Sequence, residues 1–172
     1  MSHVTKEFAN QTTPQSYHFK PTEPLPREAT QQVRLSLRKR GAVAYDMWLP
    51  ETNYLPHLLH RNEHIMGSVF GRYNLTRDNS IGRGALVATD QRVLFLDKKP
   101  MFLQVDELSF PVIGGVTFSS VFIMGFVTLH TRLGDFRLRT FNIKNAANFV
   151  DYIETKCLQQ TSENGSNFDS VT

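Results

Sequence analysis

Apolar and polar residues alternate with a period of two from residue 65 onward, a pattern typical of β-strands. Seven segments carry this pattern, and residues that favour turns separate them. The expected strands lie near residues 64–73, 84–89, 92–97, 103–110, 115–121, 126–132 and 135–141. The chain is therefore predicted to be mainly β, with helical segments before and after the strands.

The segment at residues 82–99, GRGALVATDQRVLFLDKK, is apolar on both of its predicted faces. Residues 89–91 interrupt the apolar pattern and favour a turn, so the segment is predicted to form a hairpin. In its second half Val93 and Phe95 point to one face, and their apolar neighbours point to the other. Each face therefore needs a cover. A closed barrel core would cover one face, and a helix or a partner chain would cover the other.

A helical pattern precedes the strands. Val33, Leu37, Ala44 and Trp48 recur at steps of four or seven, which predicts one helix over residues 30–49. Its apolar stripe is the expected cover for the outer face of the hairpin. The same segment is basic and aromatic, so contact with a membrane surface or with a second helix is the alternative.

Two further helical segments are predicted. A short piece at residues 54–60, interrupted by Pro56, brings leucines against the main body. A longer amphipathic helix follows the last strand, and its apolar stripe must dock on the sheet. That stripe consists of Ala146, Phe149, Val150, Ile153 and Cys157.

Four segments of the sequence carry a family resemblance. They are GRYN at 71–74, GALVATDQRVLFLDKK at 84–99, VTLHTRLGDFRL at 127–138 and AANFVDYI at 146–153. Together they resemble the bacterial pleckstrin-homology-like (PH-like) family called YokE-like. The resemblance covers residues 60–156. It implies a PH-like fold, in which seven strands form a bent, partly open barrel and a C-terminal amphipathic helix closes one end.

The chain is expected to divide into four parts. Residues 1–28, rich in proline and polar residues, are predicted to be a flexible arm. Residues 29–60 form the N-terminal helical segment that packs on the barrel, and residues 61–158 form the PH-like domain. The polar residues 159–172 are predicted to be a disordered tail.

Composition limits the function classes. The formal net charge is +3, and the basic residues are spread along the chain. Nucleic-acid-binding proteins usually gather Lys and Arg on one face, so no such role is predicted. The single cysteine, Cys157, cannot form an intrachain disulfide. Residues 1–20 contain no apolar run of the length that a secretory signal needs, so a cytoplasmic location is expected.

The segment HRNEH matches one zinc-peptidase pattern, and His57, His60 and His64 are the candidate metal ligands. On a continuous helix the three imidazoles would share a face. Pro56 limits the helix on one side, and the strand pattern limits it on the other, so the histidines are expected to diverge. No metal, no cofactor and no enzyme activity are therefore predicted.

The last hairpin offers a basic outer face. A turn at residues 133–134 would place residues 128, 130 and 132 opposite residues 139, 137 and 135, in that order. The interpretation is either a solvated face or a contact for anionic lipid head groups. The residues that would make this contact are His130, Arg132, Arg137 and Arg139.

The segment from Arg72 to Arg83 joins the first two predicted strands. Phosphoinositide-binding PH domains carry a compact basic cluster there. In this chain Arg72, Arg77 and Arg83 are spaced apart and Asp78 intervenes, so specific phosphoinositide binding is not predicted.

An apolar run at Val121, Phe122, Ile123 and Met124 falls where a polar turn is expected, and with Trp48 it supplies the candidate protein contacts. The sequence therefore predicts a non-catalytic PH-like binding or scaffolding module. Its predicted role is contact with an unknown protein partner or self-association. The alternative is a peripheral membrane adaptor that uses the basic hairpin face.

Overall fold

The computed structural model describes residues 27–74, 81–132 and 134–165. Most of the predicted arm and the end of the predicted tail lie outside these residues. Two boundaries differ from the prediction within the described part. The first helix already begins at Arg27, and the last helix continues to Gly165.

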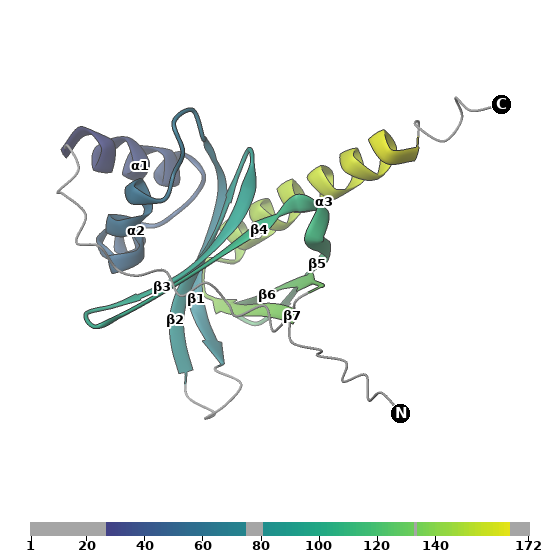
Figure 1. Ribbon diagram of the computed structural model, residues 1–172. Helices are drawn as coiled ribbons and strands as arrows, with labels where there is room; N and C mark the ends of the chain where they lie inside the picture. Colours follow the sequence, from purple (N-terminus) through teal and green to yellow (C-terminus); the bar gives the residue numbers. More distant parts are fainter. Residues whose placement is uncertain (1–26, 75–80, 133, 166–172) are drawn as a thin grey trace, which may run out of the picture.

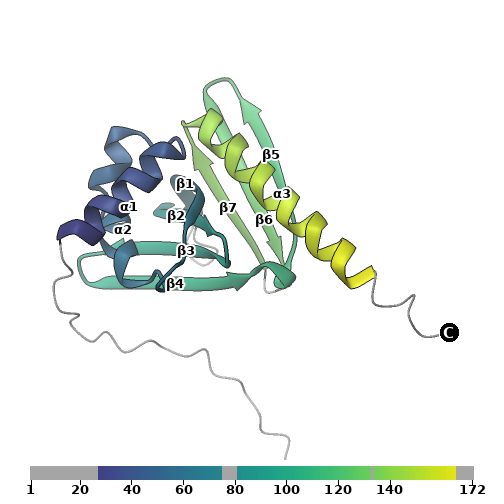
Figure 2. The ribbon, with the colours of Figure 1, turned by 90° about the horizontal axis from the view of Figure 1, so that it is seen from above.

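Seven antiparallel strands form one open sheet, which confirms the predicted mainly β fold with seven strands (Figure 1). The spatial order is β4-β3-β2-β1-β7-β6-β5. Figure 2 shows that β5–β7 run obliquely to β3 and β4, so the sheet is strongly bent. The strands are β1 (Ile65–Asn74), β2 (Ile81–Thr89), β3 (Arg92–Lys99), β4 (Phe102–Ser109), β5 (Ile113–Val121), β6 (Met124–Thr131) and β7 (Gly134–Thr140).

Helix α3 (Ile143–Gly165) covers the inner face of the sheet, where it packs against β1, β5 and β6. Ala146, Phe149 and Ile153 are completely buried, as the predicted apolar stripe requires. They join an inner core that includes Val69, Leu86, Phe95, Leu129 and Leu138. None of the helices in the described part of the chain is long and apolar enough to cross a membrane.

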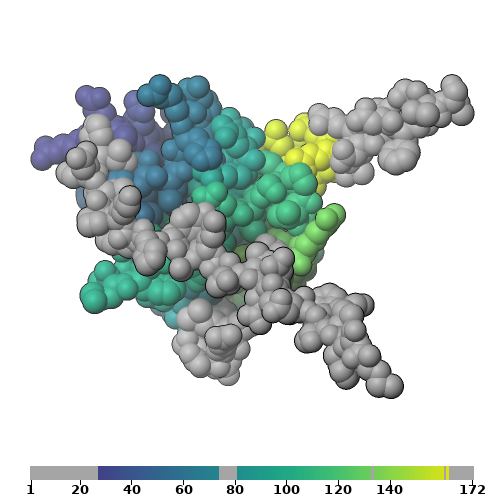
Figure 3. All heavy atoms as spheres, viewed as in Figure 1, coloured from purple at the N-terminus to yellow at the C-terminus, as the bar shows by residue number. Residues whose placement is uncertain are grey.

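The N-terminal segment covers the outer face of β1–β3, on the side opposite α3 (Figures 2 and 3). It contains α1 (Arg27–Lys39), α2 (Pro50–Tyr54) and two short 3₁₀ helices, Ala44–Trp48 and Leu55–His57. The resulting outer core consists mainly of Val33, Leu37, Leu49 and Leu55 packed against Phe70, Ala85, Val87, Leu94 and Leu96.

The prediction of one helix over residues 30–49 is wrong. Helix α1 ends at Lys39, and Gly41 follows with φ +99°, a left-handed conformation that terminates helices. The chain then turns into the first 3₁₀ helix. Trp48 is consequently 74% exposed and does not join Val33 and Leu37 on the buried stripe.

The last hairpin has a register that differs from the prediction by two residues. His130 lies opposite Asp135, and Thr128 lies opposite Arg137. The hairpin closes between Thr131 and Gly134, where the Thr131 hydroxyl donates a 2.6 Å hydrogen bond to the Gly134 carbonyl. A shift of two residues preserves the identity of each face, so the predicted apolar and polar faces still hold.

A buried ion pair ties the chain before β1 to the β2–β3 hairpin. The Glu63 carboxylate accepts hydrogen bonds from Arg92 Nε at 2.9 Å, the Thr89 hydroxyl at 2.7 Å and the His60 amide at 2.8 Å. Arg92 also contacts Glu107, whose side chain is 39% exposed, whereas the Glu63 side chain is fully buried. Glu63 therefore depends on Arg92 for charge compensation.

Burial raises the pKa of Glu63, but the hydrogen bonds and the charge of Arg92 outweigh burial, so the pKa lies below its ordinary value of 4.5. The stability that this group contributes is fully present above the unfolded-state pKa. It is lost as the pH falls through the lower folded-state pKa.

We therefore expect Glu63→Gln to lower the free energy of unfolding at neutral pH by about 3 kcal/mol, because Arg92 loses its buried partner. Urea unfolding between neutral and acidic pH measures this loss, which should shrink as the pH falls. Glu107→Gln is the matched control, with a smaller loss expected because Glu107 is partly solvated. Equal losses for the two variants would contradict this role of Glu63.

Candidate functional site

Three arginines occupy directly opposed positions on three neighbouring strands. Arg83 of β2 pairs with Arg72 of β1, and Arg72 pairs with Arg139 of β7. Directly paired residues of antiparallel strands point to the same face, so the three side chains extend from the outer face of the sheet. Arg83, Arg72 and Arg139 are referred to below as the arginine row.

The row lies where the two halves of the sheet join. Among the described residues, β1 and β7 pair at Arg72 and Arg139 alone. Gly71 lies beside this pair, and a Cβ atom at its position would overlap the carbonyl group of Arg139. The absence of a side chain at Gly71 therefore allows the two backbones to approach, which brings Arg139 to the row.

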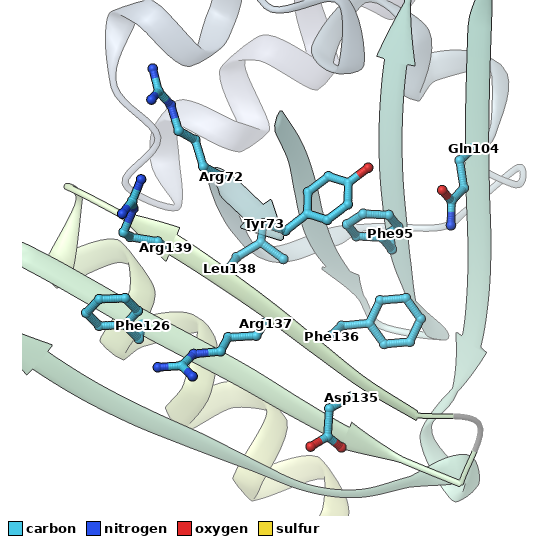
Figure 4. A pocket seen from close by; sticks show the side chains of 10 residues that line it. All are labelled: Arg72, Tyr73, Phe95, Gln104, Phe126, Asp135, Phe136, Arg137, Leu138 and Arg139. Carbon is cyan, nitrogen blue, oxygen red and sulfur yellow. The ribbon is translucent and has the colours of Figure 1, made fainter. Parts of the chain in front are cut away.

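A cavity of about 490 Å³ opens beside the row, between β1 and β7 (Figure 4). Arg72, Arg139 and Arg137 line one side of it. Arg137 also lies over the ring of Phe126, 5.2 Å from its centroid. The other lining residues include Gln104, Asp135 and Leu138.

Three aromatic rings from three strands form the opposite side of the cavity. The centroids of Tyr73 and Phe95 are 5.1 Å apart, and those of Phe95 and Phe136 are 5.4 Å apart. The Tyr73 hydroxyl donates a hydrogen bond to the buried carboxylate of Asp97. Burial and this carboxylate raise the pKa of Tyr73 above its ordinary value, so the hydroxyl keeps its proton.

The site carries excess positive charge, although Arg83 interacts electrostatically with the buried Glu51 carboxylate and Asp46 lines a second pocket beside the row. The ion pairs among the described residues involve none of the row arginines. Arg83 instead lies over the ring of Tyr45, 5.5 Å from its centroid. The acidic group at the cavity, Asp135, is paired with His130 at 3.1 Å. Like charges in directly opposed positions are destabilising, so the row favours the binding of an anion.

The structure brings together two of the four residues predicted to contact anions, Arg137 and Arg139, at the cavity. His130 faces Asp135, and Arg132 lies beyond the end of β6. Sequence reasoning assigned Arg72 to a spaced loop cluster and missed its pairing with Arg139. The position of Arg72 on the outward face of the first predicted strand could have indicated that its side chain lies on the sheet and not in the loop. Arg77 and Asp78 lie outside the described residues.

The three candidate metal ligands do not converge. His60 lies 3.5 Å from Glu63, His64 lies 3.2 Å from Asp90, and the ring of His57 lies against Tyr54. Within residues 27–74, 81–132 and 134–165, no group of three His, Cys, Asp or Glu side chains is placed to hold a metal ion.

The apolar turn between β5 and β6 projects into solvent. Phe122 is 95% exposed with φ +53°, Val121 and Ile123 are also exposed, and Met124 is half-buried. Trp48 lies on a different element, where the Arg34 guanidinium sits 5.1 Å from its ring centroid. All of the predicted protein contacts except Met124 are thus exposed, Trp48 lies apart from the turn in the sequence, and a role in protein contact stays a prediction.

A family model described as Bacterial PH domain matches residues 59–155. Among solved structures, the chain is similar to a truncated linker-DH/PH fragment of p115-RhoGEF, with 12% identity and a TM-score of 0.44, over 77% of this chain and 40% of that chain. It is also similar to a DH/PH fragment of PDZRHOGEF in complex with human RhoA. The identity is 12% and the TM-score is 0.43, over 77% of this chain and 39% of that chain. The chain thus spans about two fifths of these structures. No curated protein matches it.

If the row is strained by repulsion, removing its middle charge should stabilise the free protein. We expect Arg72→Gln to raise the free energy of unfolding by about 0.5 kcal/mol at low salt, with a smaller gain at high salt. Thermal or urea unfolding at two salt concentrations measures the change. Arg38→Gln, on the exposed surface of α1, is the control and should show no such gain. A loss of stability in Arg72→Gln would contradict the repulsion.

Proposed function

The chain belongs to the bacterial PH domain family, and we propose that it is a cytoplasmic, non-catalytic binding module that takes an acidic segment of a protein partner at the arginine row. The observation that carries the proposal is the direct opposition of Arg83, Arg72 and Arg139, none of which forms an ion pair within the described part of the chain. A bound carboxylate would compensate this charge.

The shape of the site supports a protein segment as the ligand. Arg72, Arg137 and Arg139 line a cavity whose other side is aromatic, so the positive charge borders a hollow in the surface. A side chain of a peptide can enter such a cavity, whereas the flat surface of a membrane would contact only the rim of the cavity. Guanidinium groups also bind carboxylates in a two-pronged geometry, which gives direction as well as affinity.

The titratable groups at the cavity support a binding role over catalysis. Tyr73 keeps its proton and donates it in a hydrogen bond to Asp97. Asp135 is engaged by His130. Neither group is arranged beside a nucleophile in the way that general base catalysis requires.

Affinity capture with immobilised protein tests the proposal. We expect the wild type to retain a partner with an acidic segment, with retention that weakens as the salt concentration rises. The double variant Arg72→Glu, Arg139→Glu should lose this partner, because the substitutions reverse the charge of the row. Arg38→Glu makes the same kind of change at a remote exposed position and should retain it. Equal capture by all three proteins would refute the role of the row.

A second candidate function is peripheral attachment to an anionic membrane, and the exposed β5–β6 turn favours it. Val121, Phe122 and Ile123 are 51%, 95% and 72% exposed. Arg139 lies opposite Phe126, close to this end of the β6–β7 hairpin. An apolar turn beside basic side chains suits a membrane surface, because the turn can insert below the head groups while the cations stay at the anionic surface. Each cation near that surface adds about 1 kcal/mol to the binding free energy.

Vesicle sedimentation tests this second function. The wild type should pellet with phosphatidylserine-containing vesicles and not with neutral ones, and the double variant Phe122→Ser, Ile123→Ser should stay in solution. Light scattering on the same proteins provides a separate readout. If the wild type dimerises, the variant does not, and neither binds vesicles, the turn mediates self-association instead of membrane attachment.

A further inference from the structure

We propose that the acidic segment binds as an added β-strand along the free edge of β7, within the cavity between β1 and β7. The inference rests on the proposed function of the arginine row and adds the conformation and chemistry of the ligand. Its starting point is a strand edge that is mostly unpaired among the described residues, although it lies inside the sheet and not at either end of the sheet order.

The edge of β7 is paired very unequally on its two sides. On one side, β6 pairs with every residue of β7 from Gly134 to Thr140. On the other side, β1 pairs with β7 at Arg139 alone among the described residues. Residues 134–138 thus have no described strand partner on that side, over a length of about 17 Å. Free backbone donors and acceptors along a strand edge are a template for another strand.

The other two free edges suit an acidic strand less well. Strand β4, at one end of the sheet, carries Asp106 and Glu107 and would repel it. Strand β5, at the other end, carries no Lys or Arg over Ile113–Val121. The β7 edge differs because Arg72, Arg137 and Arg139 line the space beside it.

The two faces of this edge specify the ligand sequence. Successive residues of a strand point to opposite faces. On the outer face an added strand would meet Arg137 and Arg139, and on the inner face it would meet the rings of Tyr73, Phe95 and Phe136. The preferred ligand is therefore an extended segment in which acidic and apolar residues alternate.

Charge also sets the position of the ligand along the edge. Asp135 lies toward the start of β7, where an acidic side chain would face a carboxylate. Arg137 and Arg139 lie further along the same strand. The acidic residues of the ligand are thus expected beside Arg137, next to the Arg72–Arg139 pair, with an uncharged residue next to Asp135.

A fluorescently labelled peptide of about seven residues that alternates Glu and Val tests the inference on the full chain. The matched probes are two copies of the peptide, each N-methylated at one alternate set of backbone amides. Alternate N–H groups of a strand point to the same neighbour, so one set would face β7 and the other would face away. Methylation affects the conformation of both copies alike, and only one copy loses its pairing with β7.

We expect one methylated peptide to bind at least about tenfold more weakly than the parent, and the other to bind within about threefold of it. Arg137→Glu should lower the affinity of the protein for the parent peptide by about tenfold, whereas Arg38→Glu should leave this affinity unchanged. In NMR spectra, the parent peptide should shift the amide signals of Phe136 and Leu138 more than those of residues on β5.

Three results would overturn strand addition. If both methylated peptides bind like the parent and binding still needs Arg137 and Arg72, the arginines at the cavity bind acidic segments without backbone pairing, and the proposed function survives. If no peptide binds while the protein captures an acidic partner through Arg72 and Arg139, strand addition fails alone. If no peptide binds and the arginines serve only vesicle binding, both proposals fail, and the row is a membrane contact.

Discussion

Strands β2 and β3 are buried on both faces, and the rest of the molecule is arranged around this constraint. Leu86 and Phe95 point into the inner core, and Val87 and Leu94 point into the outer core, each with at most 2% of its surface exposed. A hairpin of this kind is stable only when both faces are covered. Helix α3 with β5–β7 covers one face, and the N-terminal helices cover the other.

The proposed site lies where the outer cover ends. Along β1 and β2, Phe70 and Ala85 are buried under the N-terminal segment. The next residues on the same face, Arg72 and Arg83, lie at the margin of this cover, where Arg83 meets the ring of Tyr45, and the bend of the sheet brings Arg139 beside them. The same closure that buries the inner core thus places three cations together. Such a cluster of like charges is expected to lower the stability of the free protein, a cost that is typical of a surface selected for binding.

Much of the fold was predictable because local patterns determine it. The alternation of apolar and polar residues located the strands, and the helical spacing of apolar residues identified α3. The apolar character of both faces of residues 82–99 indicated that two elements must cover this hairpin. The errors have physical causes. Gly41 adopts a left-handed conformation and interrupts the predicted 30–49 helix. The last turn closes at Gly134, which shifts the register by two residues but preserves the faces. The site was predictable only in part, because the pairing of Arg72 with Arg139 joins strands far apart in the chain.

The central claim is that the arginine row and the adjoining edge of β7 form the surface that a partner covers. Hydrogen–deuterium exchange of the chain, free and with the captured acidic partner, tests this claim most directly. Partner binding should slow exchange at the backbone amides of residues 71–74 and 134–139 and leave the β5–β6 turn unchanged. Slowed exchange confined to residues 121–124 or to α1, with β7 unaffected, would contradict it.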